Sequence, residues 1–115
     1  LEIPPQTTLQ VLVVDNDDTP SAEPLVSRIS ADYPHDLHYR HVPGRNISIA
    51  RNACLDISHA EYLAFMDDDE MARPGWLKAL FLALESTGAT VALGPVHALY
   101  APSAPEWLKK GDFHS

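Results

Sequence analysis

Short apolar runs alternate along the chain with segments whose apolar residues recur at helical spacing, and this alternation restricts the possible folds. The predicted strands are residues 9–14, 37–42, 61–66 and 89–96. The predicted helices are residues 20–33, 48–57 and 74–87, with prolines opening the first and third and Gly88 ending the third. Strands joined through helices need right-handed crossovers. The sequence therefore predicts an α/β fold, a three-layer sandwich with a mostly parallel sheet.

Length and charge narrow the classes of function. The chain has 115 residues, 45% of them hydrophobic, which suits one domain with a modest core. Sixteen acidic residues against eight Lys and Arg give a net charge of −8, which argues against nucleic acid or an anionic membrane surface as a partner. No apolar run reaches the roughly 20 residues that span a bilayer. The single cysteine, Cys54, fits a reducing compartment, and we expect it to be a packed helix residue rather than a reactive thiol.

Acidic residues follow two of the predicted strands directly. They are Asp15, Asp17, Asp18, Asp67, Asp68 and Asp69. Ligands of open parallel sheets bind beyond the carboxyl ends of the strands, so neighbouring strands would bring these acids to one rim. A divalent cation such as Mg²⁺ or Mn²⁺, which prefers oxygen ligands, would relieve their repulsion. The alternative is a solvated acidic loop at the start of the helix opened by Pro74, and spacing alone leaves both open.

Four motifs in order carry a resemblance to a known family. They are "VLVVDNDDT", "GRNISIARNACLD", "YLAFMDDDEMARPGWL" and "VALGPV". Together they resemble the nucleotide-binding half of the family 2 glycosyltransferases, which have the GT-A fold, over about residues 9–110. The segment after "VAL" is similar to members of the succinoglycan-synthesis type, which build bacterial exopolysaccharides. The resemblance implies that residues 1–115 are a partial GT-A, Rossmann-like domain that lacks the family's first strand and acceptor half, with an irregular tail over 97–115.

The resemblance also implies roles for residues near the first two motifs. Asp15 matches the acid that contacts the uracil or ribose of a sugar nucleotide, and Asn16 and Asp17 would line the same pocket. Arg51 matches an arginine near the base and the diphosphate. As an alternative, Arg51 is a surface helix residue paired with a nearby acid.

The third motif matches the Asp-x-Asp motif of the family. Its last acid binds the metal and the earlier ones meet the ribose and the sugar, so Asp69 and Asp67 are predicted metal ligands and Asp67 and Asp68 predicted sugar-nucleotide ligands, with Mn²⁺ or Mg²⁺ as the cofactor. The implied reaction moves a sugar from a nucleotide-diphosphate sugar to a saccharide or lipid-linked acceptor, with inversion. The general base is expected beyond Ser115, which would leave this chain inactive alone; Glu106 and Asp112 are weak substitutes.

Three other classes of function are alternatives to this one. A nucleotide-binding or assembly module would keep the fold without catalysis. A nucleotidyltransferase would also use acids and Mg²⁺, but it would usually carry a Gly-rich, basic phosphate loop, which the sequence lacks. A zinc site at His35, His38 and His41 is disfavoured because the last two would face opposite sides of a strand.

Two expectations concern the chain as a whole. A sheet without the family's first strand exposes an edge or an apolar face, so we expect self-association or pairing with another part of the protein. The predicted location is the cytoplasm, with membrane association left open for the full-length protein.

Overall fold

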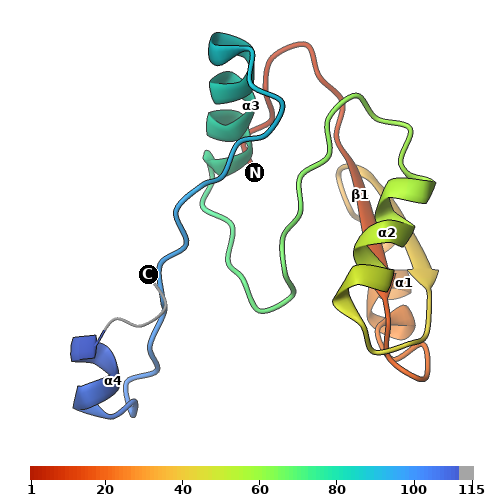
Figure 1. Cartoon of the computed structure of the whole chain (residues 1–115). Helices are drawn as coiled ribbons and strands as arrows, with labels where there is room; N and C mark the ends of the chain where they lie inside the picture. Colours follow the sequence, from red (N-terminus) through yellow and green to blue (C-terminus); the bar gives the residue numbers. More distant parts are fainter. Residues whose placement is uncertain (112–115) are drawn as a thin grey trace. The chain divides into compact units, whose positions relative to one another are not determined.

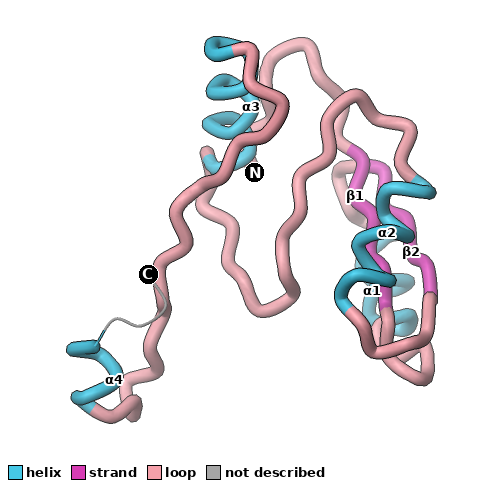
Figure 2. The backbone as a smooth tube through the Cα atoms, in the orientation of Figure 1, coloured by secondary structure: helices cyan, strands magenta, loops and turns pink. Residues whose placement is uncertain are grey.

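The computed structural model describes residues 1–111 (Figures 1 and 2). The chain divides into two compact units. We call Pro5–Met71 the sheet unit, and we call Leu1–Pro4 together with the residues from Ala72 onward the helical unit. Each unit is described by itself.

The sheet unit contains a parallel pair of strands. Strand β1 is Gln10–Asp15 and β2 is Asp36–His41, paired in register from Gln10 opposite Asp36 to Asp15 opposite His41. The helix α1, Glu23–Ser30, connects them, and α2, Ile47–Ile57, follows β2. The expected α/β class with a parallel sheet is confirmed, and both strands and α2 lie within a residue of their predicted positions.

Helices α1 and α2 both pack against the strands. Asp15 and Tyr39 contact the start of α1, through the Ala22 N–H and the charge of Glu23. Ile57 of α2 lines a pocket with residues of both strands, Leu12, Val13 and Val14 of β1 and His38, Tyr39 and Arg40 of β2. Val26 of α1, 7% exposed, is the buried apolar residue of the sheet unit, so the core of this unit is small.

The first helix is shorter than predicted. It begins at Glu23 and ends at Ser30, with Pro24 rather than Pro20 in its first turn. The reason is a tertiary contact: the N–H of Ala22 donates to Asp15, so the residues before Glu23 form a turn instead of helix.

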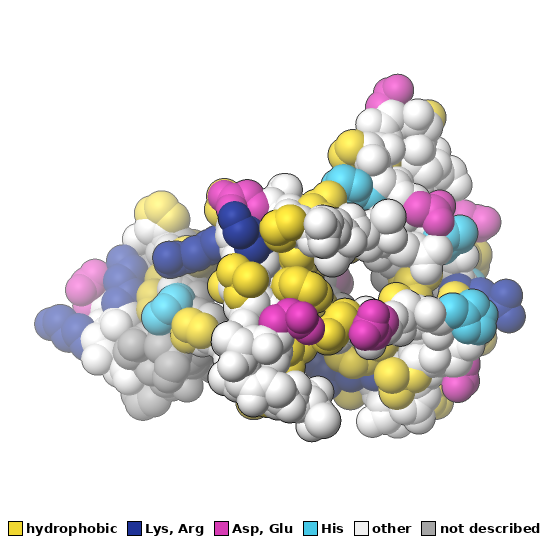
Figure 3. Space-filling view, turned by 90° about the horizontal axis from the view of Figure 1, so that it is seen from above, with side chains coloured by type: hydrophobic (Ala, Val, Ile, Leu, Met, Phe, Trp, Pro, Cys, Tyr) yellow, Lys and Arg dark blue, Asp and Glu magenta, His cyan; other side chains and the backbone are white. Residues whose placement is uncertain are grey.

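The predicted third and fourth strands are wrong for this structure. Residues 61–66 and 89–96 pair with no strand, and the sheet in the described residues consists of β1 and β2 alone. An apolar run becomes a strand only where a neighbouring backbone accepts and donates hydrogen bonds, which composition does not reveal. Large apolar side chains of both segments consequently lie exposed, Phe65 and Leu93 among them. Figure 3 shows apolar side chains in several places on the surface.

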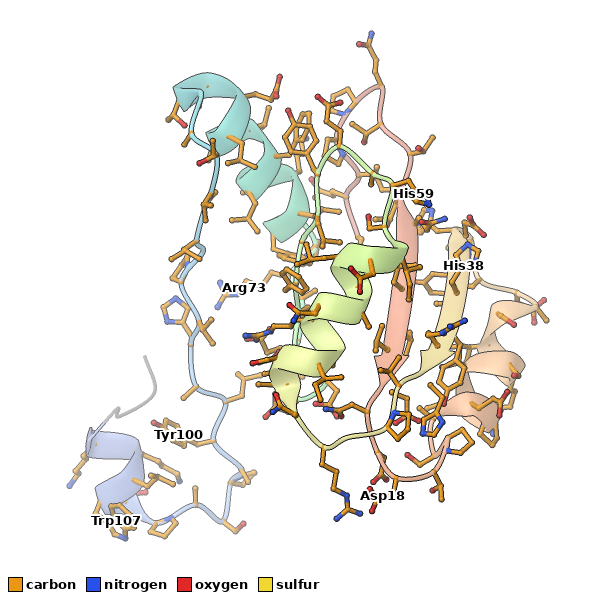
Figure 4. The ribbon with its side chains drawn as sticks, turned by 45° about the vertical axis from the view of Figure 1, so that its right-hand side comes forward. Asp18, His38, His59, Arg73, Tyr100 and Trp107 are labelled. Atoms are coloured by element: carbon orange, nitrogen blue, oxygen red, sulfur yellow. The ribbon has the colours of Figure 1, made fainter. Side chains whose placement is uncertain are left out.

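The helical unit is built around α3, Trp76–Thr87, which ends at Gly88 with a left-handed φ of 65°, as predicted. Glu2 joins its start: the Glu2 N–H donates to the carbonyl of Pro74 (2.7 Å), and its carboxylate lies 3.8 Å from the amine of Lys78. The tail is less irregular than expected, because Glu106–Gly111 form the helix α4, which carries Trp107 (Figure 4). Asp112 lies outside the described residues.

None of the helices in the described part of the chain is both long enough and apolar enough to cross a membrane.

Candidate functional site

Asp15 organises the loop that follows β1. It is only 9% exposed. One oxygen accepts the N–H of Asp17 (3.0 Å), and the other accepts the N–H of Ala22 (2.9 Å) and the hydroxyl of Tyr39 (2.8 Å). Both carboxylate oxygens therefore accept hydrogen bonds from groups of the protein itself. Asp15 lies at the predicted position, the carboxyl end of β1, where it fixes the path of residues 15–22.

These contacts shift two pKa values in opposite directions. The Ala22 N–H is the largest cause of a lowered pKa for Asp15; burial opposes it, and Asp17, Tyr39 and His41 add to the lowering. Burial, followed by the hydrogen bond to Asp15 and the charges of Asp15 and Glu23, raises the pKa of Tyr39 to about 12. Across the neutral range the pair is thus a carboxylate that accepts a bond from a neutral phenol.

The loop after β1 is tied to the loop after β2. The N–H of Arg45 donates to the carbonyl of Asn16 (2.9 Å), and its guanidinium lies 2.8 Å from Asp18 and 3.3 Å from Asp17. His41 Nε2 lies 2.8 Å from the carbonyl oxygen of Asp17. Figure 4 shows Asp18 at one end of the sheet unit and His59 at the other. The predicted pocket residues Asn16 and Asp17 thus lie together at the carboxyl end of the two strands.

The turn that presents Arg45 depends on backbone conformation. Gly44 has φ of 148° and Arg45 has φ of 45°. A Cβ at Gly44 would lie 3.1 Å from Cδ1 of Ile49, so both the conformation and the space favour glycine there.

Arg51 and Asp67, predicted from separate motifs, meet in the structure. Nη2 of Arg51 donates to Oδ1 of Asp67 at 3.0 Å, and its Cζ lies 5.9 Å from the ring centre of Phe65. Helix α2 positions Arg51, and its first turn is capped by Asn46, whose side chain accepts the N–H of Ser48 (2.8 Å). Arg51 therefore pairs with an acid, as the alternative interpretation expected, and that acid belongs to the predicted Asp-x-Asp motif.

The acidic segment forms a turn. The N–H of Glu70 donates to the carbonyl of Asp67 (3.2 Å), and the N–H of Asp67 donates to the carboxylate of Glu70 (3.1 Å). Within residues 1–111 the side chains of Asp68 and Asp69 make no hydrogen bond or ion pair. Their carboxylates are exposed and available to a ligand.

The acids after β1 and those of the turn do not form one cluster. Among the described residues, no group of three or more His, Cys, Asp and Glu side chains converges to hold a metal ion. The expected shared rim required residues 61–66 to join the sheet beside β1, and they do not. Carboxylate oxygens nevertheless suit a hard cation, and Mg²⁺ commonly uses one or two carboxylates together with substrate phosphates. Asp67 and Asp69 fit that donor chemistry.

Two residues of this region were missed by the sequence analysis. Tyr39 faces Asp15 from β2, and Arg45 reaches Asp17 and Asp18 from the turn after β2. A signal was present for Arg45, because parallel neighbouring strands end at the same edge. Tyr39 could have been found from the alternation of side chains along β2, once the register of the two strands was known.

The remaining candidates are two histidines and the cysteine. His38 lies near Asp36 (2.9 Å) and Gln10 (3.1 Å), while His41 contacts the loop after β1, so the two histidines serve different surroundings. Cys54 is half-buried, and this burial raises the pKa of its thiol, which disfavours a reactive thiolate.

The chain is similar in sequence to a known family and to two known proteins. The model of glycosyl transferase family 2 matches residues 2–112. The succinoglycan biosynthesis protein ExoM of Rhizobium meliloti (strain 1021) is 49% identical over 115 residues, which are 100% of this chain and 37% of that protein. The uncharacterized glycosyltransferase YibD of Escherichia coli (strain K12) is 24% identical over 124 residues, covering 91% of this chain and 36% of that protein. The chain thus spans little more than a third of either relative, and no solved structure matches it.

Proposed function

The chain belongs to glycosyl transferase family 2, and from that membership we propose that it forms the sugar-nucleotide-binding part of an enzyme that builds a bacterial polysaccharide. The enzyme would move a sugar from a nucleotide-diphosphate sugar to the hydroxyl of a saccharide or lipid-linked acceptor. The link to polysaccharide synthesis rests on the 49% identity with a succinoglycan biosynthesis protein over the whole chain.

One contact carries the proposal at the level of residues. Nη2 of Arg51, a residue expected near the diphosphate, lies 3.0 Å from Oδ1 of Asp67, a residue of the acidic motif. Sixteen positions separate the two residues in sequence. A guanidinium offers planar, paired donors that match phosphate oxygens. Because the chain carries a net charge of −8, an anionic donor needs such a local cation.

The carboxylates supply the second part of the proposed site. Asp69 and Asp67 are the residues that would hold Mn²⁺ or Mg²⁺, and Asp68 would contact the sugar nucleotide. A divalent cation at this place would stabilise the charge that develops on the departing nucleoside diphosphate. The exposed, unpartnered carboxylate of Asp69 supports the assignment.

The loop after β1 would hold the nucleoside. Asn16 and Asp17 line it, and Asp15 shapes it through its bonds to Asp17, Ala22 and Tyr39. Asp15 was expected to touch the base or ribose itself. Because both of its oxygens already accept bonds, we propose that it acts chiefly by holding the loop in the conformation that receives the nucleoside.

Inversion by a single displacement requires a carboxylate that takes the proton of the acceptor hydroxyl. We expect that base beyond Ser115, so the 115-residue chain alone would bind the donor without turning it over. Glu106, the described acid of the tail, pairs with Lys109 at 3.4 Å on the surface of α4, which does not suggest a base.

We place the enzyme in the cytoplasm, with membrane association open for the full-length protein.

Calorimetric titration of UDP, and then dTDP, into the full-length protein tests the proposal. We expect binding that depends on Mn²⁺ and that weakens at least about tenfold, or ~1.4 kcal/mol, in Asp69→Ala. Asp32→Ala, which removes an exposed acid at the end of α1, is the matched control and should bind like the wild type. Equal binding with and without Mn²⁺ would exclude the metal role, and no binding of either nucleotide would exclude the donor class. Release of pyrophosphate instead of sugar transfer would indicate a nucleotidyltransferase.

A further inference from the structure

The guanidinium of Arg51 contacts two residues of the acidic segment at once. It donates to Oδ1 of Asp67 (3.0 Å), and its Cζ lies 5.9 Å from the ring centre of Phe65. Both side chains therefore lie on the side of the segment that faces α2. A planar cation can pair with a carboxylate while its flat face lies on an aromatic ring. Two different contacts thus hold Arg51 in place beside Asp67.

The pair is weak enough to exchange. The side chains of Arg51 and Asp67 are 47% and 48% exposed, and exposed ion pairs contribute little to stability. This distinguishes Asp67 from Asp15, whose two oxygens are committed to three bonds in a nearly buried position. Asp67 also borders Asp68 and Asp69, so Arg51 offsets part of the repulsion within the turn.

If Asp67 and Asp69 hold a divalent cation, as the proposed function states, Arg51 and that cation require the same carboxylate. Two positive charges at one oxygen repel each other. We propose that Arg51 is a positioning residue that occupies Asp67 in the metal-free protein and is released toward the donor's diphosphate when the carboxylate takes the cation. Arg51 then has free donors at the moment when a phosphate needs them.

This exchange makes two binding events depend on each other. Metal at Asp67 frees Arg51 for the diphosphate, and a diphosphate that binds Arg51 frees Asp67 for the metal. By linkage the two effects are equal in size. Mn²⁺ alone should therefore bind less tightly than Mn²⁺ in the presence of UDP, and part of this difference should come from Arg51.

The test measures Mn²⁺ binding to the full-length protein from the electron paramagnetic resonance signal of free Mn²⁺, with and without UDP. Arg51→Gln should bind Mn²⁺ alone about two- to fivefold more tightly than the wild type, since an exposed pair is worth no more than about that factor. The enhancement by UDP should be smaller in this variant. Phe65→Leu removes the ring without changing charge, and should shift Mn²⁺ binding in the same direction by less.

Two further variants separate position from charge. Arg28→Gln removes an exposed guanidinium from the last turn of α1, and should leave Mn²⁺ binding unchanged. Arg51→Lys keeps the charge but loses the planar group, so it should bind Mn²⁺ alone about as the wild type does and show less enhancement by UDP. Circular dichroism checks that each variant is folded.

The outcomes distinguish this inference from the proposed function. If the wild type binds Mn²⁺ at Asp69 but Arg51→Gln binds Mn²⁺ alone no more tightly, the exchange is wrong and the metal site stands. If Arg51→Gln and Arg28→Gln tighten binding equally, the effect is one of net charge and the exchange is also wrong. If the wild type binds no Mn²⁺ with or without UDP, both proposals fail.

Discussion

At the scale of single residues, Asp15 is a predicted ligand that also holds the fold together through three hydrogen bonds. Its carboxylate lies at the end of β1. It accepts hydrogen bonds from the N–H groups of Asp17 and Ala22, which precede α1, and from the hydroxyl of Tyr39 on β2. Sequence spacing placed it at the carboxyl end of a strand. Two of its three partners could not be predicted, because they depend on where α1 begins and how β2 is registered.

This arrangement predicts how stability depends on pH. The pKa of Asp15 is lowered in the folded state, chiefly by the Ala22 N–H, so its contribution is present above the ordinary value of 3.8 and is lost as the pH falls below it, through the folded value. Asp15→Asn should reduce the free energy of unfolding at pH 7 by about 1–3 kcal/mol, because an amide cannot accept all three bonds. The difference from the wild type should shrink below pH 4.

Urea unfolding between pH 2.5 and 7 measures this difference. Asp32→Asn, at an exposed acid of the same unit, is the control and should follow the wild type at every pH. A gap between Asp15→Asn and the wild type that stays constant down to pH 2.5 would contradict the assignment.

At the scale of elements, α2 connects the sheet to the acidic turn. It begins at Ile47, after its N-cap Asn46 and the turn of Gly44 and Arg45, and its Arg51 donates to Asp67. The N-cap bond from the Ser48 N–H to Asn46 therefore fixes the end of the helix nearest the loop of Asn16 and Asp17.

Replacing this cap should weaken the element in a graded way. Asn46→Ala removes the acceptor for the Ser48 N–H and should cost about 1 kcal/mol in the free energy of unfolding, whereas Asn46→Ser keeps an acceptor and should cost only a few tenths. Denaturant unfolding of the two variants side by side measures the difference. Equal losses would show that the cap does not stabilise α2.

At the scale of the whole molecule, many large apolar side chains of the described residues lie exposed. Residues 61–66 and 89–96 leave large side chains exposed and join no sheet. Unpaired backbone next to exposed apolar side chains favours association with another chain or with another part of the protein.

We therefore expect the 115-residue chain by itself to self-associate. Size-exclusion chromatography with light scattering should give a mass above that of one chain, rising with concentration. Leu93→Lys, at a 92% exposed position of the unpaired segment, should lower that mass, while Leu25→Lys, at a 51% exposed position of α1, should not. A monodisperse monomer at all concentrations would refute the expectation.

Local sequence patterns were enough to predict the α/β class, the parallel order, both strands, α2 and the end of α3 at Gly88. These depend on local periodicity, caps and turn residues, whose effects act within a few positions of the chain. The same patterns placed Arg51 on a helix and Asp67 after an apolar run. The family followed from four motifs in order, and the match over residues 2–112 confirms it.

Long-range contacts, in contrast, select the apolar runs that become strands and the acids that have partners. Residues 61–66 are as apolar as β1 but have no neighbouring strand, and Asp15 differs from Asp69 only in what surrounds it. The physical reason is the same in each case. Hydrogen bonds and ion pairs between distant residues depend on which backbones and side chains the fold brings together, and a single sequence does not encode that proximity in any local pattern.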